Sequence, residues 1–149
     1  MEKATELGVE EIYPIHTDFC ALAKNIAENK IDKWQKTMYE ASKQCERANI
    51  PTCHNLQTLK VLPYSDFDKV IVFAERDAQM SLKQFIADNP ISDGARVLVV
   101  IGPEGGFSQK EFDWFKEQNL PLVSLGKLIL KAETAAITGI GNLIYGYFE

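Results

Sequence analysis

A glycine-rich stretch at residues 101–108 carries the clearest chemical signal in this sequence of 149 residues. It reads Ile-Gly-Pro-Glu-Gly-Gly-Phe-Ser, and Gly102, Gly105 and Gly106 would let the backbone approach a ligand closely. The stretch matches neither a Walker sequence nor the Gly-x-Gly-x-x-Gly of dinucleotide sites, and the Glu104 carboxylate would repel a polyphosphate. A cationic or zwitterionic ligand therefore fits better than a phosphate, with a plain strand-to-helix turn as the alternative.

Other residue types that carry catalysis are sparse. His16 and His54 lie in no triad or metal-ligand pattern, so each is expected to be structural or exposed. Cys20, Cys45 and Cys53 are odd in number and lack metal-type spacing, which favours packing roles in a reduced setting over a disulfide framework. The sequence thus predicts neither a metal site nor nucleophilic catalysis by these residues.

Carboxylates occur in three segments that are expected to be loops. Glu75, Glu104 and Glu133 each follow an apolar, strand-like run. The carboxyl ends of parallel strands share one edge of a sheet, so these three carboxylates would meet if the loops converge. The alternative is that each is a separate, solvated loop residue.

The elements expected to position these loops alternate between strands and helices. Apolar runs predict strands at residues 11–16, 69–75, 95–101 and 122–125. Helical periodicity and capping signals predict helices at residues 1–7 with Gly8 as a left-handed cap, from Ile31 to Ala48, at 81–86, after a Ser108–Glu111 capping box, and at 134–148. This order predicts one α/β domain with a mostly parallel sheet and ligand-binding loops at residues 75–78, 102–107 and 126–133.

Charge and hydropathy limit the function classes. The net charge is −5, so the chain lacks the basic footprint of an autonomous nucleic-acid binder. On the helix from Ile31, Lys33, Lys36, Lys43 and Arg47 interleave with glutamates, which indicates a solvated face or, alternatively, a local phosphate-binding surface. No apolar run approaches the length of a membrane span and no leader is apparent, so a cytoplasmic protein that does not contact membranes is expected.

Four ordered motifs carry a resemblance to a known family. They are residues 3–9 (Lys-Ala-Thr-Glu-Leu-Gly-Val), residues 40–51 with Gln44-Cys45, Arg47 and Ile50-Pro51, residues 101–108, and residues 124–135 with Ser-Leu-Gly, Ile129-Leu130 and Glu-Thr-Ala. Together they resemble the RsmE family, SPOUT-class methyltransferases that methylate N3 of a uridine in small-subunit (16S) ribosomal RNA. The matches cover almost the whole chain.

The resemblance implies a trefoil-knotted α/β domain over residues 1–149 that acts as a homodimer and binds S-adenosylmethionine. This cofactor carries a sulfonium and an ammonium group but no phosphate, which agrees with Glu104. The family's cofactor site carries over onto Gly102, Pro103, Glu104, Gly105, Gly106, Leu125, Gly126, Ile129, Leu130, Glu133, Thr134 and Ala135.

The implied reaction moves a methyl group to a ring nitrogen that must first lose its proton. Glu104 and Glu133, with Glu6, are weak candidates for the proton acceptor, and water or a backbone group is the alternative. Gln44, Arg47 and Lys131 are expected near the RNA or across the dimer interface, where a cation can position phosphate.

The chain departs from the family pattern at three positions. Family members commonly have glycine at the position of Glu46 and arginine at those of Leu128 and Lys131, and losing a guanidinium weakens bidentate phosphate contacts. Family members also usually carry an amino-terminal PUA-like RNA-binding domain that is absent from these 149 residues. The alternatives are a catalytically impaired dimeric domain that binds cofactor or RNA, and a related SPOUT enzyme acting on another RNA.

Overall fold

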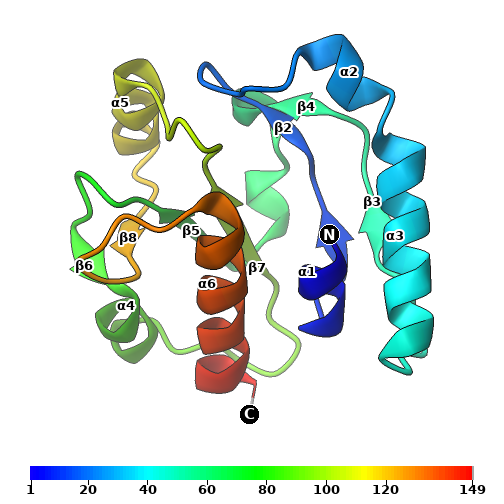
Figure 1. The fold of residues 1–149 in the computed structure, drawn as a ribbon. Coiled ribbons are helices and arrows are strands. Elements are labelled where there is room, and N and C mark those ends of the chain that lie inside the picture. Colours follow the sequence, from blue (N-terminus) through cyan, green and yellow to red (C-terminus); the bar gives the residue numbers. More distant parts are fainter. Residues whose placement is uncertain (149) are drawn as a thin grey trace. The chain divides into compact units, whose positions relative to one another are not determined.

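The structure is a computed structural model that describes residues 1–148. The chain forms two compact units, Met1–Leu62 and the part from Pro63 onward. Every paired strand in both units runs parallel to its neighbour, as the alternating element order predicts (Figure 1). Among the described residues, no helix combines the length and apolar character that a membrane crossing needs.

The first unit contains short strands beside a long helix. Its elements are α1 (Glu2–Glu6), β1 (Glu11–Ile12), β2 (Ile15–His16), α2 (Lys24–Glu28), α3 (Ile31–Gln44), β3 (Thr52–Cys53), β4 (Gln57–Thr58) and the 3₁₀ turn η1 (Leu59–Val61). β1 pairs with β3 and β2 pairs with β4, which makes separate two-stranded sheets. α1 and α3 pack against each other, and Met38 and Ala41 of α3 are buried.

The strand predicted at residues 11–16 is interrupted, which corrects that prediction. β1 ends at Ile12 and β2 begins at Ile15, with Pro14 between them. Pro14 has no amide hydrogen to donate to a ladder, although its carbonyl accepts from Gln57 N at 2.9 Å. A proline in the middle of the run therefore splits one strand into two.

The helix predicted from Ile31 to Ala48 ends early, at Gln44. Glu46 adopts a left-handed conformation with φ 58°. Arg47 N donates to Ser42 O at 3.0 Å and Glu46 N donates to Lys43 O at 3.4 Å, which together form a Schellman motif. Apolar periodicity predicted where this helix lies but not where it ends. Cys45 and Ala48 continue the apolar spacing beyond Gln44, although the backbone reverses direction at Glu46.

The second unit is built on a four-stranded parallel sheet in the order β6-β8-β5-β7. Its elements are the 3₁₀ turn η2 (Tyr64–Asp66), β5 (Lys69–Phe73), β6 (Met80–Ser81), α4 (Leu82–Asp88), β7 (Val97–Ile101), α5 (Gln109–Glu117), β8 (Leu122–Ser124) and α6 (Ala132–Tyr147). The predicted capping box at the start of α5 is confirmed: Ser108 Oγ accepts from Glu111 N at 3.3 Å, and Ser108 N donates to Glu111 Oε2 at 2.8 Å.

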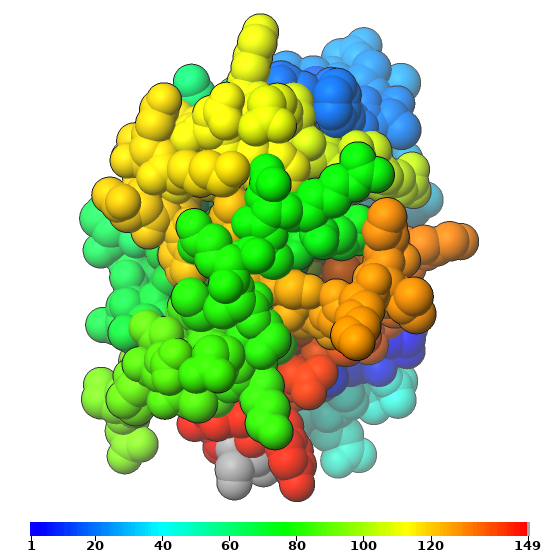
Figure 2. Space-filling model, turned by 90° about the vertical axis from the view of Figure 1, so that its left-hand side faces the viewer, coloured from blue at the N-terminus to red at the C-terminus, as the bar shows by residue number. Residues whose placement is uncertain are grey.

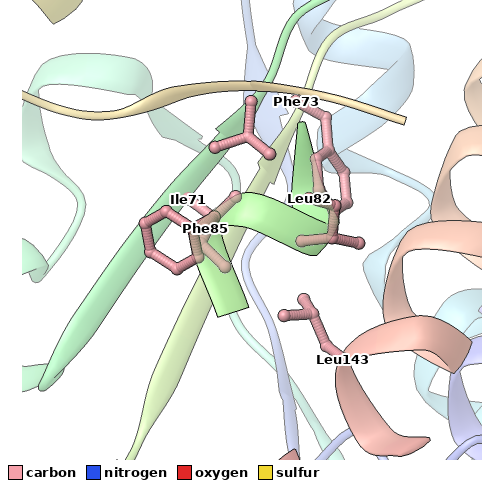
Figure 3. Packing of buried hydrophobic residues seen from close by; sticks show 6 residues of the cluster. Ile71, Phe73, Leu82, Phe85 and Leu143 are labelled. Carbon is pink, nitrogen blue, oxygen red and sulfur yellow. The ribbon is translucent and has the colours of Figure 1, made fainter. Parts of the chain in front are cut away.

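The core of this unit lies between the sheet and helices α4 and α6. Ile71, Phe73, Leu82, Phe85, Val123 and Leu143 form one buried cluster, and Figure 3 shows Phe85 next to Ile71 and Leu143 facing the cluster from α6. Ile71 and Val123 are fully buried, which fits strands covered on both faces.

Helix α6 buries a narrow stripe that includes small residues. Ala135, Gly139 and Leu143 are buried and Tyr147 packs against the core cluster, whereas Ile137 is 44% exposed. Small residues lie against the sheet because the helix approaches it closely: a Cβ at Gly139 would overlap the ring of Phe73. The large exposed side chains of α6 are therefore available to another surface.

Candidate functional site

A cleft of about 280 Å³ opens at the carboxyl end of the sheet in the second unit. Three loops form its walls, one after β5, one after β7 and one after β8. The structure thus confirms that the loops predicted at residues 75–78, 102–107 and 126–133 converge, as expected for an open parallel sheet.

Ten of the twelve residues expected to bind cofactor line this cleft. They are Gly102, Pro103, Glu104, Gly105, Gly106, Leu125, Gly126, Ile129, Leu130 and Ala135. Glu133 and Thr134 are exposed residues of the first turn of α6 and are not part of the lining. Ala132 and Ala135, three residues apart on the helix, face the cleft, so the two residues between them point in other directions.

The loop after β7 is a tight turn held by its own backbone. Gly106 N donates to Pro103 O at 2.8 Å, and Gly106 has φ 73°, a conformation that favours glycine. A Cβ added at Gly106 would meet open space, whereas one at Gly102 would lie 3.1 Å from the Phe107 ring. Gly106 thus permits the turn, and Gly102 leaves room for a buried aromatic side chain.

The segment after β8 is fixed by two side chains. Ser124 Oγ donates to Gly126 O at 2.7 Å and accepts from Gly126 N at 3.1 Å. Glu75 Oε1, from the loop after β5, accepts from Leu130 N at 3.0 Å. In Figure 2 these loops after β5 (green) and β8 (orange) lie side by side on one face of the second unit.

The carboxylates predicted to converge do so only in part. Glu75 and Glu104 both line the cleft and are exposed, whereas Glu133 is outside it. Over residues 1–148 no group of three or more His, Cys, Asp or Glu side chains could hold a metal ion. The cleft therefore combines two carboxylates and the guanidinium of Arg76 with the backbone groups of its glycine-rich loops.

The three residues expected at the RNA or the dimer interface have different surroundings. Arg47 Nη1 donates to the carbonyls of Thr5 and Val9, both at 2.8 Å, so this side chain ties the end of α1 to the end of α3. Gln44 is exposed and lines a groove between α1 and α3. Lys131 is exposed at the N-cap of α6, next to the cleft-lining Leu130.

Several residues that line the cleft were not among the individual residues expected to bind cofactor. Arg76, Phe107 and Ala132 lie inside the predicted ligand-binding loops, whereas Phe73, Ala74, Phe112 and Val123 lie outside them. Phe107 is buried and packs edge-on against Phe112 and Phe115, with ring centroids 5.9 and 4.9 Å away. Their available signal was position, because most of them end a strand or border one of the predicted loops.

Histidine and cysteine contacts agree with the structural roles expected for them. His54 Nε2 lies 2.8 Å from Glu11 Oε2, and its ring stacks on Tyr13 with centroids 4.0 Å apart. Burial raises the pKa of the Cys53 thiol above its usual value, which disfavours the nucleophilic thiolate. All three cysteines are free.

Comparison with known proteins identifies relatives along nearly the whole chain. "Ribosomal RNA small subunit methyltransferase E" of Bacillus subtilis is 30% identical over 97% of this chain, and its counterpart in Mesomycoplasma hyopneumoniae is 31% identical over 92%. The chain spans 59% of the length of each of these two relatives.

Solved structures share the fold. Ribosomal RNA small subunit methyltransferase E from Neisseria gonorrhoeae, bound to S-adenosyl methionine, matches with a TM-score of 0.80 and 26% identity. Lpg2936 of Legionella pneumophila, in complex with the cofactor SAM, matches with a TM-score of 0.83 and 28% identity. Each match covers 98% of this chain and 59% of the other.

A family model described as an RNA methyltransferase domain matches residues 1–144. The match includes all three loops that line the cleft, and it agrees with the family that the four sequence motifs indicate. The chain belongs to the RNA methyltransferase domain family.

Proposed function

We propose that this chain is an S-adenosylmethionine-dependent methyltransferase domain that acts on N3 of a uridine in small-subunit ribosomal RNA. The observation that carries the proposal is the cleft, in which ten residues of the expected cofactor site lie together. Two related structures of the same fold are described as bound to this cofactor. Cofactor binding by these ten residues is part of the proposal, and Glu133 and Thr134 lie outside the cleft lining.

The chemistry of the cleft suits this cofactor. Its lining mixes apolar side chains with backbone groups of glycines, which can hold an adenosine without side-chain obstruction. Glu104 supplies negative charge that attracts a sulfonium and an ammonium group and repels phosphates. The cofactor supplies the methyl group, and the protein orients the target nitrogen toward it.

Proton removal from the uridine is the step for which the chain offers a choice of groups. Glu104 lies in the cleft lining, whereas Glu133 and Glu6 do not, so Glu104 is the best placed of the three carboxylates predicted for this role. Glu133 is exposed in the first turn of α6, outside that lining. The proposal therefore assigns proton transfer to Glu104 or to a water molecule that it orients.

A homodimer is part of the proposal, supported by the exposed face of α6. Ile137, Tyr145 and Phe148 are 44%, 81% and 50% exposed, and their spacing puts them on one side of the helix. Large apolar side chains gathered on one helix face are typical of an interface. Sedimentation of the wild type and of Tyr145→Lys tests this contact, because the charge would shift a dimer toward monomer.

The proposed trefoil knot is supported by the strand order. β8 lies between β5 and β6, which are earlier in the chain, and is hydrogen-bonded to both. The segment leaving β8 therefore starts inside the sheet, beside the loop that joins β5 to β6. A chain that leaves the sheet at this point and continues into α6 follows the path that a trefoil knot requires, in which the last segment passes through an earlier loop.

RNA recognition is proposed to need a further module, in line with the PUA-like domain usual for the family. The net charge of −5 opposes tight binding to a polyanion by these 149 residues alone. Lys131, beside the cleft, is the proposed phosphate contact, whereas Arg47 Nη1 is already bonded to two carbonyls. The proposed location is the cytoplasm, where a ribosomal substrate would be met.

Incubation of small ribosomal subunits that lack the modification with methyl-labelled cofactor and a high concentration of this chain, at low salt to offset its weak RNA binding, tests the activity. Nuclease digestion and mass spectrometry then identify the labelled nucleoside. We expect 3-methyluridine at one position, at a rate that falls steeply with salt. Label on another base would contradict the uridine assignment and favour a related enzyme with another RNA target.

An impaired domain that only binds cofactor or RNA is the second candidate. The observation behind it is Leu128, which is 78% exposed at the cleft where family members commonly carry an arginine. Saturable cofactor binding without any label in the same assay would support it. Restoration of labelling by Leu128→Arg would attribute the loss to this position.

A further inference from the structure

One carboxylate joins two loops that line the cleft. Glu75 Oε1 accepts a hydrogen bond from Leu130 N at 3.0 Å, across 55 positions of the sequence. Glu75 lies two residues beyond the end of β5 and follows Phe73 and Ala74, which are 7% and 4% exposed. The acceptor is thus attached to a rigid, buried part of the sheet, whereas the donor belongs to an exposed loop.

That exposed loop has few other constraints. Ser124 fixes its beginning through two hydrogen bonds with Gly126, and Lys131 begins α6 at its end. Between them, Leu128 and Ile129 are 78% and 69% exposed, so packing contributes little to the loop's shape. The hydrogen bond from Leu130 N to Glu75 is therefore the main contact that holds the second half of the loop at residues 126–130, which forms one wall of the cleft.

We propose that Glu75 is a positioning residue that preorganises the loop at residues 126–130 for the ligand of the cleft. The inference rests on the proposed function for the identity of that ligand, but not for the existence of the contact. A loop that is already held in its binding conformation loses less conformational entropy when the ligand binds, so the ligand binds more tightly. The role requires an acceptor oxygen, and a glutamine could supply it.

Hydrogen exchange without any ligand tests the contact itself. In Glu75→Ala the amide of Leu130, the donor of this bond, should exchange about tenfold faster, the effect of losing one charge-assisted hydrogen bond. Glu75→Gln should stay within about threefold of the wild type because its amide oxygen still accepts. Glu117→Ala, which removes an exposed carboxylate of α5 away from the cleft, is the matched control and should leave the exchange of this amide unchanged.

Calorimetry with S-adenosylhomocysteine tests the consequence. Glu75→Ala should raise Kd about tenfold, Glu75→Gln less than threefold, and Glu117→Ala not at all. In methyl transfer, KM for the cofactor should rise while kcat at saturation stays near the wild-type value, because Glu75 is not assigned to the chemical step.

Three results would overturn the inference. They are unchanged exchange in Glu75→Ala, faster exchange spread over the whole second unit, and equal loss of affinity in the alanine and glutamine variants. The last would mean that the negative charge itself contacts the ligand. If the wild type fails to bind the probe, only the proposed function falls, and the exchange data still decide whether Glu75 holds the loop.

Discussion

Gly139 of α6 lies directly against the ring of Phe73 at the end of β5, so closely that a Cβ at this position would overlap the ring. Phe73 also lines the cleft, and Gly139 is buried. This contact brings the closing helix onto the strand that ends at the candidate site. The closeness of that approach can be tested by adding a single methyl group.

Gly139→Ala should destabilise the protein by about 2 kcal/mol. Alanine favours the helix by about 1 kcal/mol, but a Cβ that overlaps a buried ring this strongly costs about 3 kcal/mol, the upper end for overpacking, and moves the ring. Urea unfolding measures the difference. Gly146→Ala in the same helix is the control, because its Cβ would meet only the flexible end of Ile86, and it should be nearly neutral. Equal effects in the two variants would contradict the close approach.

Gly106→Ala should separate backbone strain from ligand binding. Gly106 and Gly94 have φ of 73° and 76°, and neither has an atom near its missing Cβ. Alanine should therefore cost about 1 kcal/mol of stability at either position. Only the Gly106 variant should bind S-adenosylhomocysteine more weakly, since Gly94 is not a residue of the cleft lining. Calorimetry on both variants measures the two affinities. An unchanged affinity in Gly106→Ala would mean that the loop after β7 is only a strand-to-helix turn and does not bind the ligand.

Glu46→Gly should stabilise the protein by about 1 kcal/mol. Glu46 has φ 58° after the end of α3, a conformation that costs a residue with a Cβ about 1–2 kcal/mol and glycine almost nothing. Lys36→Gly, inside the same helix and exposed, should instead destabilise by about 1 kcal/mol. Denaturant midpoints of both variants would show opposite shifts. A loss of stability in Glu46→Gly would contradict the cap geometry.

Arg47→Ala should lower stability by about 2 kcal/mol, because it leaves the carbonyls of Thr5 and Val9 without their cationic donor. Lys43→Ala removes an exposed pair with Glu40 and an exposed cation–π contact with Tyr39, and should cost about 0.5–1 kcal/mol. Thermal unfolding of the two variants measures both losses of stability. A stability unchanged by Arg47→Ala would mean that this side chain serves contacts outside the chain, as the motif resemblance suggested.

Local sequence signals predicted the parts of the fold that depend on neighbouring residues. The capping box of Ser108 and Glu111 is present with both hydrogen bonds, and Gly8 closes α1 with φ 90°. The convergence of the three loops followed from a general rule about parallel sheets, so most of the cleft lining was predictable without coordinates.

Long-range contacts were not predictable in this way. The partners of Arg47 lie 38 and 42 positions away, and the partner of Glu75 lies 55 away, with no periodicity connecting them. Glycine at position 139 carries no hydropathy signal, so its place in the core could not be distinguished from an exposed one. Ile137 shows the converse, because an apolar residue at a helix surface fits an interface as well as a core.

Binding of S-adenosylhomocysteine to the wild-type chain, measured by titration calorimetry, tests the central claim most directly. We expect saturable binding with one site per chain. The binding should also raise the melting temperature of the protein, because the ligand binds the folded state alone. A folded protein that gives no binding heat and no thermal shift at millimolar ligand would contradict the assignment of the cleft.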